Sequence, residues 1–165
     1  HRPEEPAVKY RYLKSPIGEI LIAGDDEGLR FIGFPEGKGR IEPQPEWTRS
    51  DRAFADAARQ LKEYFAGKRR NFDLDIAPEG TRFQRSVLDA LQGIPYGESR
   101  SYAEIAAKVG RPRAVRAVGA ANGRNPLPIV IPCHRVIGSN GSLTGFGGGI
   151  ETKRFLLELE RKHAA

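Results

Sequence analysis

The sequence contains a single cysteine, Cys133, and a histidine, His134, follows it directly. A thiol beside an imidazole can perform nucleophilic catalysis, because the imidazole can accept the proton that the thiol loses. Arg135 comes next, and a cationic neighbour lowers the pKa of a thiol. A lone cysteine is also common as an inert residue of a core. The residues alone therefore leave two interpretations of Cys133 open, a reactive thiol and a packed apolar side chain.

The last expected helix has a carboxylate, Glu160, among its apolar residues, where it needs a hydrogen-bond or ion-pair partner. At 100° per residue, Glu160 projects inside the apolar arc of that helix. Burying an unpaired carboxylate is costly. Lys153, which projects nearby, is one candidate partner. The imidazole of His134 is the other, and a carboxylate there would fix the tautomer that accepts a proton from Cys133.

The composition excludes several classes of protein. The chain has 165 residues, of which 39% are hydrophobic and 29% charged, and no apolar run is long enough to span a membrane. One cysteine and three histidines are too few for a disulfide framework or a thiolate zinc site. The glycine-rich stretch 138–149, which includes Gly145, lacks the Gly-Lys-Ser/Thr ending of a phosphate loop. We expect no metal, no cofactor, no membrane association and a reducing, cytoplasmic compartment.

The positive charge is concentrated in one segment. Residues 81–140 hold nine basic and three acidic side chains, and this surplus of six equals the net charge of the whole chain, +6. A basic half joined to a neutral half favours a polyanionic partner, because neutralised phosphates release their counterions. A solvated basic surface without a partner is the alternative.

Two short helices are expected inside the basic segment. Ser101 and Glu104 have the spacing of a capping box that starts one helix, which stops at Gly110. A second helix is expected from Arg113 to about Gly123, and the pair has the outline of a helix-turn-helix. Small residues dominate the second helix. They either let it approach a backbone or narrow groove, or pack it against its neighbours.

The first half favours a small sheet. Apolar alternation predicts strands near residues 8–12, 19–23 and 29–34, which form an antiparallel meander. An irregular connection, a helix from Asp51 to Gly67 and a strand over Asn71–Ile76 follow. The sequence predicts an α/β (α+β) fold with an N-terminal sheet lobe at 1–76, a linker at 77–80 and a mainly helical lobe at 81–165.

The segment before Cys133 is bounded by prolines. Pro126–Pro132 is a short apolar run typical of a buried strand or extended segment. Adjacent side chains of an extended chain point to opposite sides. A bridging water or a turn is therefore needed for proton transfer between Cys133 and His134.

These residues resemble a known family. Asn125-Pro126, Ile131-Pro132-Cys133-His134-Arg135-Val136-Ile137 and the glycine-rich stretch are similar to the O6-alkylguanine-DNA alkyltransferases, or methylated-DNA–protein-cysteine methyltransferases. The resemblance extends to Ile94-Pro95-Tyr96-Gly97 and Arg116-Ala117-Val118-Gly119 and covers residues 81–160. It implies irreversible, single-turnover transfer of an alkyl group from O6 of guanine, with O4 of thymine as a second substrate, to Cys133.

The resemblance also implies roles for individual residues. Cys133 is the nucleophile, His134 accepts its proton through a water, and Glu160 orients His134. The helix-turn-helix enters the minor groove, and Arg116 fills the gap that the flipped nucleotide leaves in the base stack. Tyr102 assists the rotation of that nucleotide. The other expected DNA contacts are Ser101, Arg113, Arg124 and Arg135. The expected substrate pocket comprises Tyr102, Asn125, Pro128, Val136, Ile137, Phe146, Gly147 and Gly148.

Two pocket residues depart from the family pattern. Phe146 stands where many members carry Tyr, and Gly147 stands where some carry Ser, so the sequence does not determine which alkyl group fits. The resemblance implies that the partner is double-stranded DNA containing O6-alkylguanine. We expect the protein to bind it as a monomer, and whether several molecules assemble cooperatively along DNA stays open. The alternatives are a helix-turn-helix module, a lesion reader without chemistry and a Cys-His hydrolase with turnover.

Overall fold

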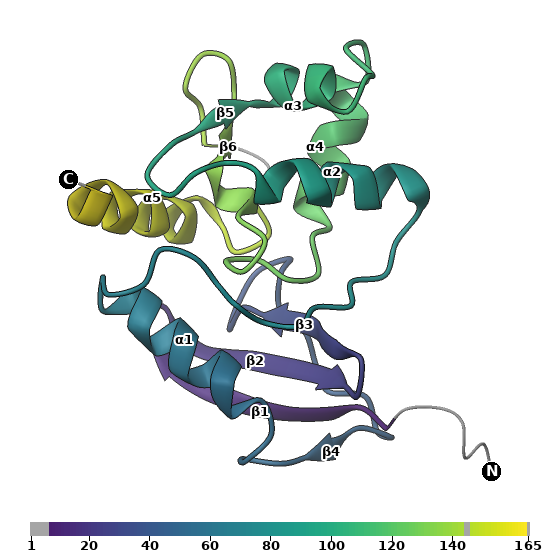
Figure 1. Cartoon of the computed structure of the whole chain (residues 1–165), viewed down its shortest axis with the longest axis vertical. Helices are drawn as coiled ribbons and strands as arrows, with labels where there is room; N and C mark the ends of the chain where they lie inside the picture. Colours follow the sequence, from purple (N-terminus) through teal and green to yellow (C-terminus); the bar gives the residue numbers. More distant parts are fainter. Residues whose placement is uncertain (1–6, 144–145, 165) are drawn as a thin grey trace.

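The computed structural model describes residues 7–143 and 146–164, so Gly145 lies outside the described residues. An N-terminal sheet with one helix forms one layer, and the remaining helices lie above it (Figure 1). The predicted α/β fold is therefore confirmed. Buried apolar side chains from both halves form a single core, and Tyr64, Leu91, Ile131 and Leu156 are among its fully buried members.

The N-terminal sheet has the order β3-β2-β1-β4. The strands β1 (Lys9–Ser15), β2 (Gly18–Asp25) and β3 (Gly28–Gly33) form the predicted antiparallel meander. The short strand β4 (Thr48–Arg49) pairs in parallel with β1. It lies within the connection that was expected to be irregular.

The helix α1 (Ala55–Phe65) begins four residues later than predicted, after Phe54 in a left-handed conformation (φ 56°). The expected strand 71–76 is wrong, because only an isolated bridge joins Ile76 to Leu29. The Gln60 side chain forms the hydrogen bonds with the Asp73 backbone that a neighbouring strand would otherwise form. Gln60 donates to the carbonyl oxygen of Asp73 at 3.0 Å and accepts from its amide at 2.9 Å.

Capping boxes start two helices of the second half. Thr81 caps α2 (Arg82–Gln92), and Ser101 caps α3 (Tyr102–Lys108), as predicted for Ser101. The next helix, α4 (Val115–Gly123), begins after a turn in which the Ala114 amide donates to the Arg111 carbonyl at 2.9 Å. It therefore starts two residues later than Arg113, and the helix-turn-helix outline holds.

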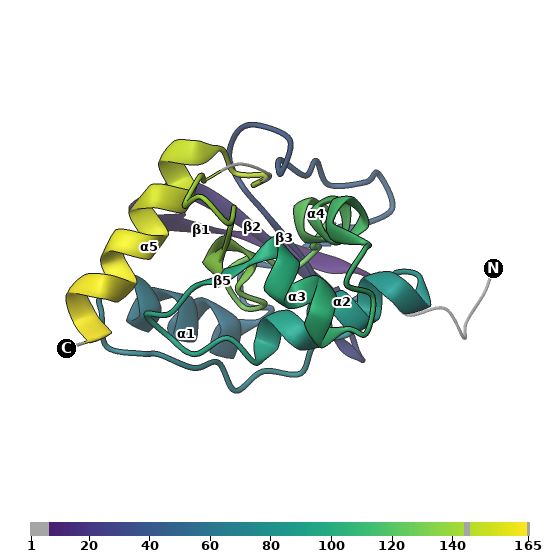
Figure 2. The same cartoon turned by 90° about the horizontal axis from the view of Figure 1, so that it is seen from above.

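The last elements surround the cysteine. The single-turn 3-10 helix η1 (Cys133–Arg135) leads into β6 (Val136–Ile137), which pairs in parallel with β5 (Arg100–Ser101). The long helix α5 (Ile150–Ala164) follows. Seen from above, α5 and α4 lie on either side of the β5–β6 pair (Figure 2).

The segment before Cys133 is not a strand. The Ile131 amide donates to the Leu127 carbonyl at 2.8 Å, and Ile129 has a left-handed backbone (φ 75°). Three prolines remove amide donors that a ladder would need. Cys133 and His134 therefore lie on a tight helical turn rather than on opposite faces of an extended chain. Within 7–143 and 146–164, no helix is long and apolar enough to cross a membrane.

Candidate active site

Cys133 is buried, with 4% of its surface exposed, but it lines a cavity of about 290 Å³. Its backbone is held on both sides. The amide of Cys133 donates to the Ile131 carbonyl at 2.7 Å, and its carbonyl accepts from the Asn122 side chain at 3.3 Å. Cys133 is therefore part of the packed interior and also lines a space that a ligand can enter.

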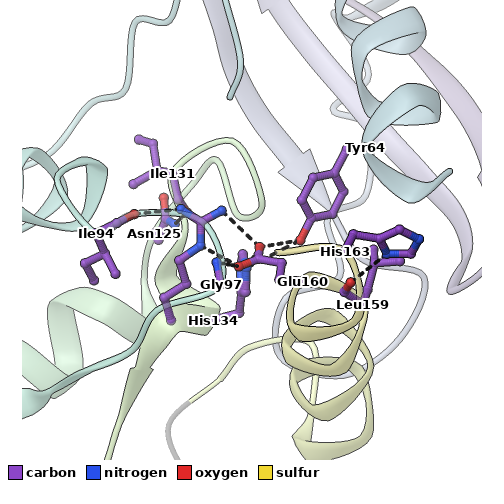
Figure 3. A network of polar contacts seen from close by, with 10 residues as sticks. Tyr64, Ile94, Gly97, Asn125, Ile131, His134, Leu159, Glu160 and His163 are labelled. Atoms are coloured by element: carbon purple, nitrogen blue, oxygen red, sulfur yellow. Dashed lines mark hydrogen bonds and ion pairs between the residues drawn. The ribbon is translucent and has the colours of Figure 1, made fainter. Parts of the chain in front are cut away.

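The imidazole of His134 is bound to Glu160. Nε2 of His134 lies 2.6 Å from Oε2 of Glu160, and both side chains are buried (Figure 3). A carboxylate only accepts, so Nε2 carries the proton and Nδ1 has a free lone pair. Nδ1 is buried and has no hydrogen-bond partner within the described part of the chain. The ring is therefore oriented by one nitrogen and able to accept a proton at the other.

Glu160 also accepts hydrogen bonds from three other residues. Its Oε2 accepts from the Tyr64 hydroxyl at 2.6 Å and from Arg135 Nη2 at 3.0 Å. Its Oε1 accepts from Arg135 Nε at 2.8 Å and from the Gly97 amide at 3.1 Å. Burial raises the pKa of Glu160, but the hydrogen bonds and charges of His134 and Arg135 outweigh it and hold that pKa far below its usual value. Glu160 is a fixed carboxylate.

Of the two partners considered for Glu160, the structure therefore brings His134 to it. Lys153 is fully buried on the same helix face. Its Nζ lies 5.8 Å from the centroid of the Tyr102 ring. Burial lowers the pKa of Lys153 to about 8, while the nearby Cys133 charge acts in the opposite direction. Lys153 thus places a cationic group beside the thiol.

The expectation of a lowered thiol pKa is wrong for this structure. Burial raises the pKa of Cys133 to about 11, and the Asn125 side chain and the Lys153 charge only partly offset it. Burial likewise lowers the pKa of His134, although Glu160 acts to raise it. At neutral pH the pair is a neutral thiol and a neutral imidazole. Forming the thiolate therefore requires transfer of its proton to an acceptor.

Arg135 is removed from the expected DNA contacts. It is 5% exposed, and its guanidinium binds Glu160 and donates to the Ile94 carbonyl at 2.7 Å. Its Nε, Nη1 and Nη2 each donate inside the protein, and the side chain is too deeply buried to reach a phosphate. It neutralises the buried carboxylate instead.

The remaining expected DNA contacts differ in their surroundings. Arg113 and Arg116 are exposed, before and within α4, and the exposed Arg124 follows that helix and lines the cavity. The hydroxyl of Ser101 accepts from the Glu104 amide at 3.0 Å, so it is used as a helix cap. On α4, Ala117 and Ala120 are exposed, whereas Val118 and Ala121 are buried. One face of α4 therefore packs against the rest of the fold, and the small residues on its other face are open to solvent.

The cavity brings together half of the expected substrate pocket, namely Asn125, Pro128, Phe146 and Gly147. Asn125 fixes the chain after α4, because it donates to the Ile131 carbonyl at 2.8 Å and accepts from the Leu127 amide at 3.0 Å. Gly148 lies against Phe146. Val136 and Ile137 pair with β5 and are not among the cavity-lining residues.

Tyr102 stands at the start of α3 and is half-buried. Burial raises the pKa of its hydroxyl, and the Cys133 charge adds to this effect. The hydroxyl therefore keeps its proton at neutral pH and can donate it in a hydrogen bond.

Sequence reasoning missed the part that the N-terminal half plays. Tyr64 of α1 donates to Glu160, and β3 with the connection after it supplies one side of the cavity. The spacing of Leu61 and Phe65 places Tyr64 near the core but gives no sign of a polar partner 96 residues away. Among the described residues, no group of three or more His, Cys, Asp or Glu side chains could hold a metal ion.

Comparisons with known proteins agree with this geometry. Residues 8–78 match the family described as 6-O-methylguanine DNA methyltransferase, ribonuclease-like domain, and residues 82–162 match its DNA binding domain. A methylated-DNA–protein-cysteine methyltransferase of Methanosarcina acetivorans is 55% identical over 92% of this chain and 97% of its own. One of Mycolicibacterium paratuberculosis is 51% identical over 95% and 94%.

Solved structures give the same result. The crystal structure of Mycobacterium tuberculosis OGT in complex with DNA superimposes with a TM-score of 0.89, at 49% identity and 94% coverage of both chains. A second structure, of the O6-methylguanine methyltransferase of that organism, has a TM-score of 0.89 at 50% identity over 96% of this chain and 95% of its own. The chain belongs to the methylated-DNA–protein-cysteine methyltransferase family.

Proposed function

We propose that this protein repairs alkylated DNA by moving an alkyl group from O6 of guanine to Sγ of Cys133, with O4-alkylthymine as a second substrate. The observation that carries the proposal is the arrangement around His134. Its Nε2 is bound to Glu160 at 2.6 Å, its buried Nδ1 has no partner among the described residues, and Cys133 lines a cavity next to it.

The reaction is a displacement at the alkyl carbon. A bond forms between Sγ and that carbon, and the bond between the carbon and O6 breaks. The thiol proton passes to Nδ1 of His134 through a bridging water, and Glu160 stabilises the resulting imidazolium. The electron pair of the broken bond goes to the guanine, whose developing charge the Tyr102 hydroxyl stabilises by donating a hydrogen bond. The thioether product has no hydrolysable bond, so each molecule acts once.

The lesion must leave the duplex to reach the thiol. Extruding a nucleotide costs a few kcal/mol, which contacts elsewhere must offset. The exposed Arg113 and Arg124 supply phosphate contacts, and the exposed Arg116 has a side chain long enough to fill the vacated stack. The open face of α4, with Ala117 and Ala120, suits the narrow minor groove. We propose that a monomer binds double-stranded DNA in this way. We also propose that it acts in the cytoplasm, at the nucleoid if the cell is bacterial.

Mass spectrometry after incubation with duplex DNA containing O6-methylguanine tests the proposal. We expect one methylene mass added to Cys133, in a one-to-one ratio to the protein. Cys133→Ser should bind the same duplex and gain no mass. Bound DNA with an unmodified thiol in the natural protein would indicate a lesion reader, and repeated turnover would indicate a hydrolase.

A further inference from the structure

Tyr64 of α1 reaches the hydrogen-bond network beside Cys133 from the N-terminal half of the chain. Its hydroxyl oxygen lies 2.6 Å from Oε2 of Glu160 and 3.5 Å from Nε2 of His134 (Figure 3). Nε2 of His134 in turn lies 2.6 Å from the same Oε2. The phenol therefore binds the carboxylate oxygen that orients the imidazole.

Packing fixes the Tyr64 ring in this position. The side chain is fully buried, and its ring centroid lies 5.5 Å from that of Phe65, 5.6 Å from that of Phe72 and 6.3 Å from that of Tyr96. Burial and the nearby charge of Glu160 raise the pKa of Tyr64 far above its usual value, so the hydroxyl keeps its proton. A carboxylate only accepts hydrogen bonds, so Tyr64 is a permanent donor to Glu160.

The imidazole of His134 must satisfy two opposed conditions if it takes the proton of Cys133. It must be neutral before the transfer, because only then does Nδ1 offer a lone pair, and its positive charge must be stabilised afterwards. Burial keeps the ring neutral, whereas the carboxylate of Glu160 favours the protonated ring. An additional donor to Oε2 stabilises the negative charge of the carboxylate and so weakens its attraction for a proton on the imidazole.

The titratable and charged groups that face this imidazole come from η1, α5 and α1. They are Cys133 and Arg135, Lys153 and Glu160, and Tyr64. The charge of Glu160 favours protonation of the ring, and the charges of Arg135 and Lys153 oppose it. Tyr64 carries no charge, so it acts on the ring through Glu160.

We propose that Tyr64 is a positioning residue for alkyl transfer, which holds Oε2 of Glu160 against Nε2 of His134 and limits the pull of the carboxylate. The imidazole then stays neutral until the thiol proton arrives at Nδ1. This inference rests on the proposed function. It gives the N-terminal half of the chain a part in the chemistry, exerted through Glu160 rather than on the reacting atoms.

Tyr96 supplies a matched control. Its ring packs edge-on against that of Tyr64, and within the described part of the chain its buried hydroxyl oxygen has no hydrogen-bond partner. Tyr96→Phe therefore removes the same atom from the neighbouring ring and leaves the hydrogen bonds of Glu160 unchanged. Tyr64→Phe keeps the aromatic packing and removes the donor to Oε2.

The experiment combines an NMR titration of the His134 ring nitrogens with single-turnover rates of methyl transfer to Cys133 across the same pH range. In Tyr64→Phe, the pKa of His134 should rise by about 0.5–1 pH unit, because a donor that shares the carboxylate charge is lost. The protonated ring cannot accept the thiol proton, so the acid limb of the rate profile should move up by the same amount. At the midpoint of the natural protein, the rate should fall by about two- to fivefold. Tyr96→Phe should change neither the titration nor the profile.

A second probe keeps the test decisive if Tyr64→Phe does not fold, or if the ring titrates below the pH range in which the protein is folded. The NMR signal of the Nε2 proton of His134 at neutral pH moves downfield as its hydrogen bond to Glu160 strengthens. It should move downfield in Tyr64→Phe, stay in place in Tyr96→Phe and move upfield when difluorotyrosine, a stronger donor, replaces Tyr64.

Two results overturn the role of Tyr64. One is an Nε2 proton signal that stays in place or moves in the opposite direction. The other is a rate that falls by the same factor at every pH, as a merely structural loss would produce. Failure of the natural protein to take up methyl overturns the proposed function instead, and it does not affect the NMR readings.

Discussion

Replacing Glu160 by glutamine removes one charge from the buried network and leaves its shape nearly intact. The carboxylate accepts five hydrogen bonds, from Tyr64, His134, Gly97 and twice from Arg135. A glutamine amide offers one oxygen and turns its NH2 group toward donors. Arg135, which is 5% exposed, keeps the Ile94 carbonyl and at most one hydrogen bond to the amide oxygen, and it loses the negative charge that neutralised it.

The expected loss of stability follows from the unpaired guanidinium. Removing one member of a buried ion pair lowers the free energy of unfolding by about 3–5 kcal/mol. Tyr64→Phe is the comparison, because it removes a single hydrogen bond to the same carboxylate and creates no buried charge. It should lower the free energy of unfolding by about 1.5–3 kcal/mol.

The difference in free energy of unfolding between Glu160→Gln and the natural protein should become smaller at acid pH. The pKa of Glu160 is lowered in the folded protein by its hydrogen bonds with His134 and Arg135, against an ordinary value of 4.5. A carboxyl with a lowered folded pKa stabilises the fold above its unfolded pKa, and this contribution is lost as the pH falls below it. The natural protein should lose stability below pH 4.5 by about 1.4 kcal/mol per pH unit relative to the variant.

Urea unfolding at pH 7 and at pH 3, followed by tryptophan fluorescence, measures both quantities. At pH 7, methyl transfer by Glu160→Gln should also be slower by about a hundredfold, because the imidazolium loses its carboxylate. A loss of stability below about 1 kcal/mol at pH 7, or a difference that does not change with pH, would contradict a charged Glu160 in the folded protein.

Three further predictions concern DNA and the thiol. Arg116→Ala should slow repair of duplex DNA far more than reaction with free O6-benzylguanine, because only the duplex has a stack to fill; equal losses in the two assays would rule out this role. Lys153→Met should raise the pKa of the Cys133 thiol further, measured by its ultraviolet absorbance against pH, and slow methyl transfer, because the Lys153 charge lowers that pKa; Lys153→Arg should retain most of the rate. Binding of duplex DNA should weaken with salt at a logarithmic slope of about −2 if Arg113 and Arg124 each neutralise one phosphate, and a slope near zero would refute phosphate contact.

The local patterns of the sequence predicted the elements that lie close to the cysteine. The capping box at Ser101 and the apolar arc around Glu160 depend on neighbours within two turns of helix, so a single sequence contains the information. The cost of burying a carboxylate predicted that Glu160 has a partner but left Lys153 and His134 both open, and the family resemblance favoured His134. The buried strand or extended segment expected before Cys133 is instead a turn, because the prolines remove amide donors and Ile129 has a left-handed backbone.

Long-range contacts were beyond the sequence. Tyr64 meets Glu160 across 96 residues, and Gly39 meets Gly147 across the two halves of the chain. Arg135 was expected among the DNA contacts that the family resemblance implies, and only its burial against Glu160 shows the different role. The sign of the Cys133 pKa shift also depends on burial, which adjacent residues do not reveal.

The contact between Gly39 and Gly147 joins two distant stretches of chain that touch through bare backbone. A Cβ added to Gly147 would lie 3.3 Å from the Gly39 Cα, and one added to Gly39 would lie 3.1 Å from the Gly147 carbonyl oxygen. A substitution at either position therefore affects the space that is available at the other. A bulkier residue at either position must push the facing turn outward, and because both glycines line the cavity beside Cys133, that displacement would change the width of the cavity.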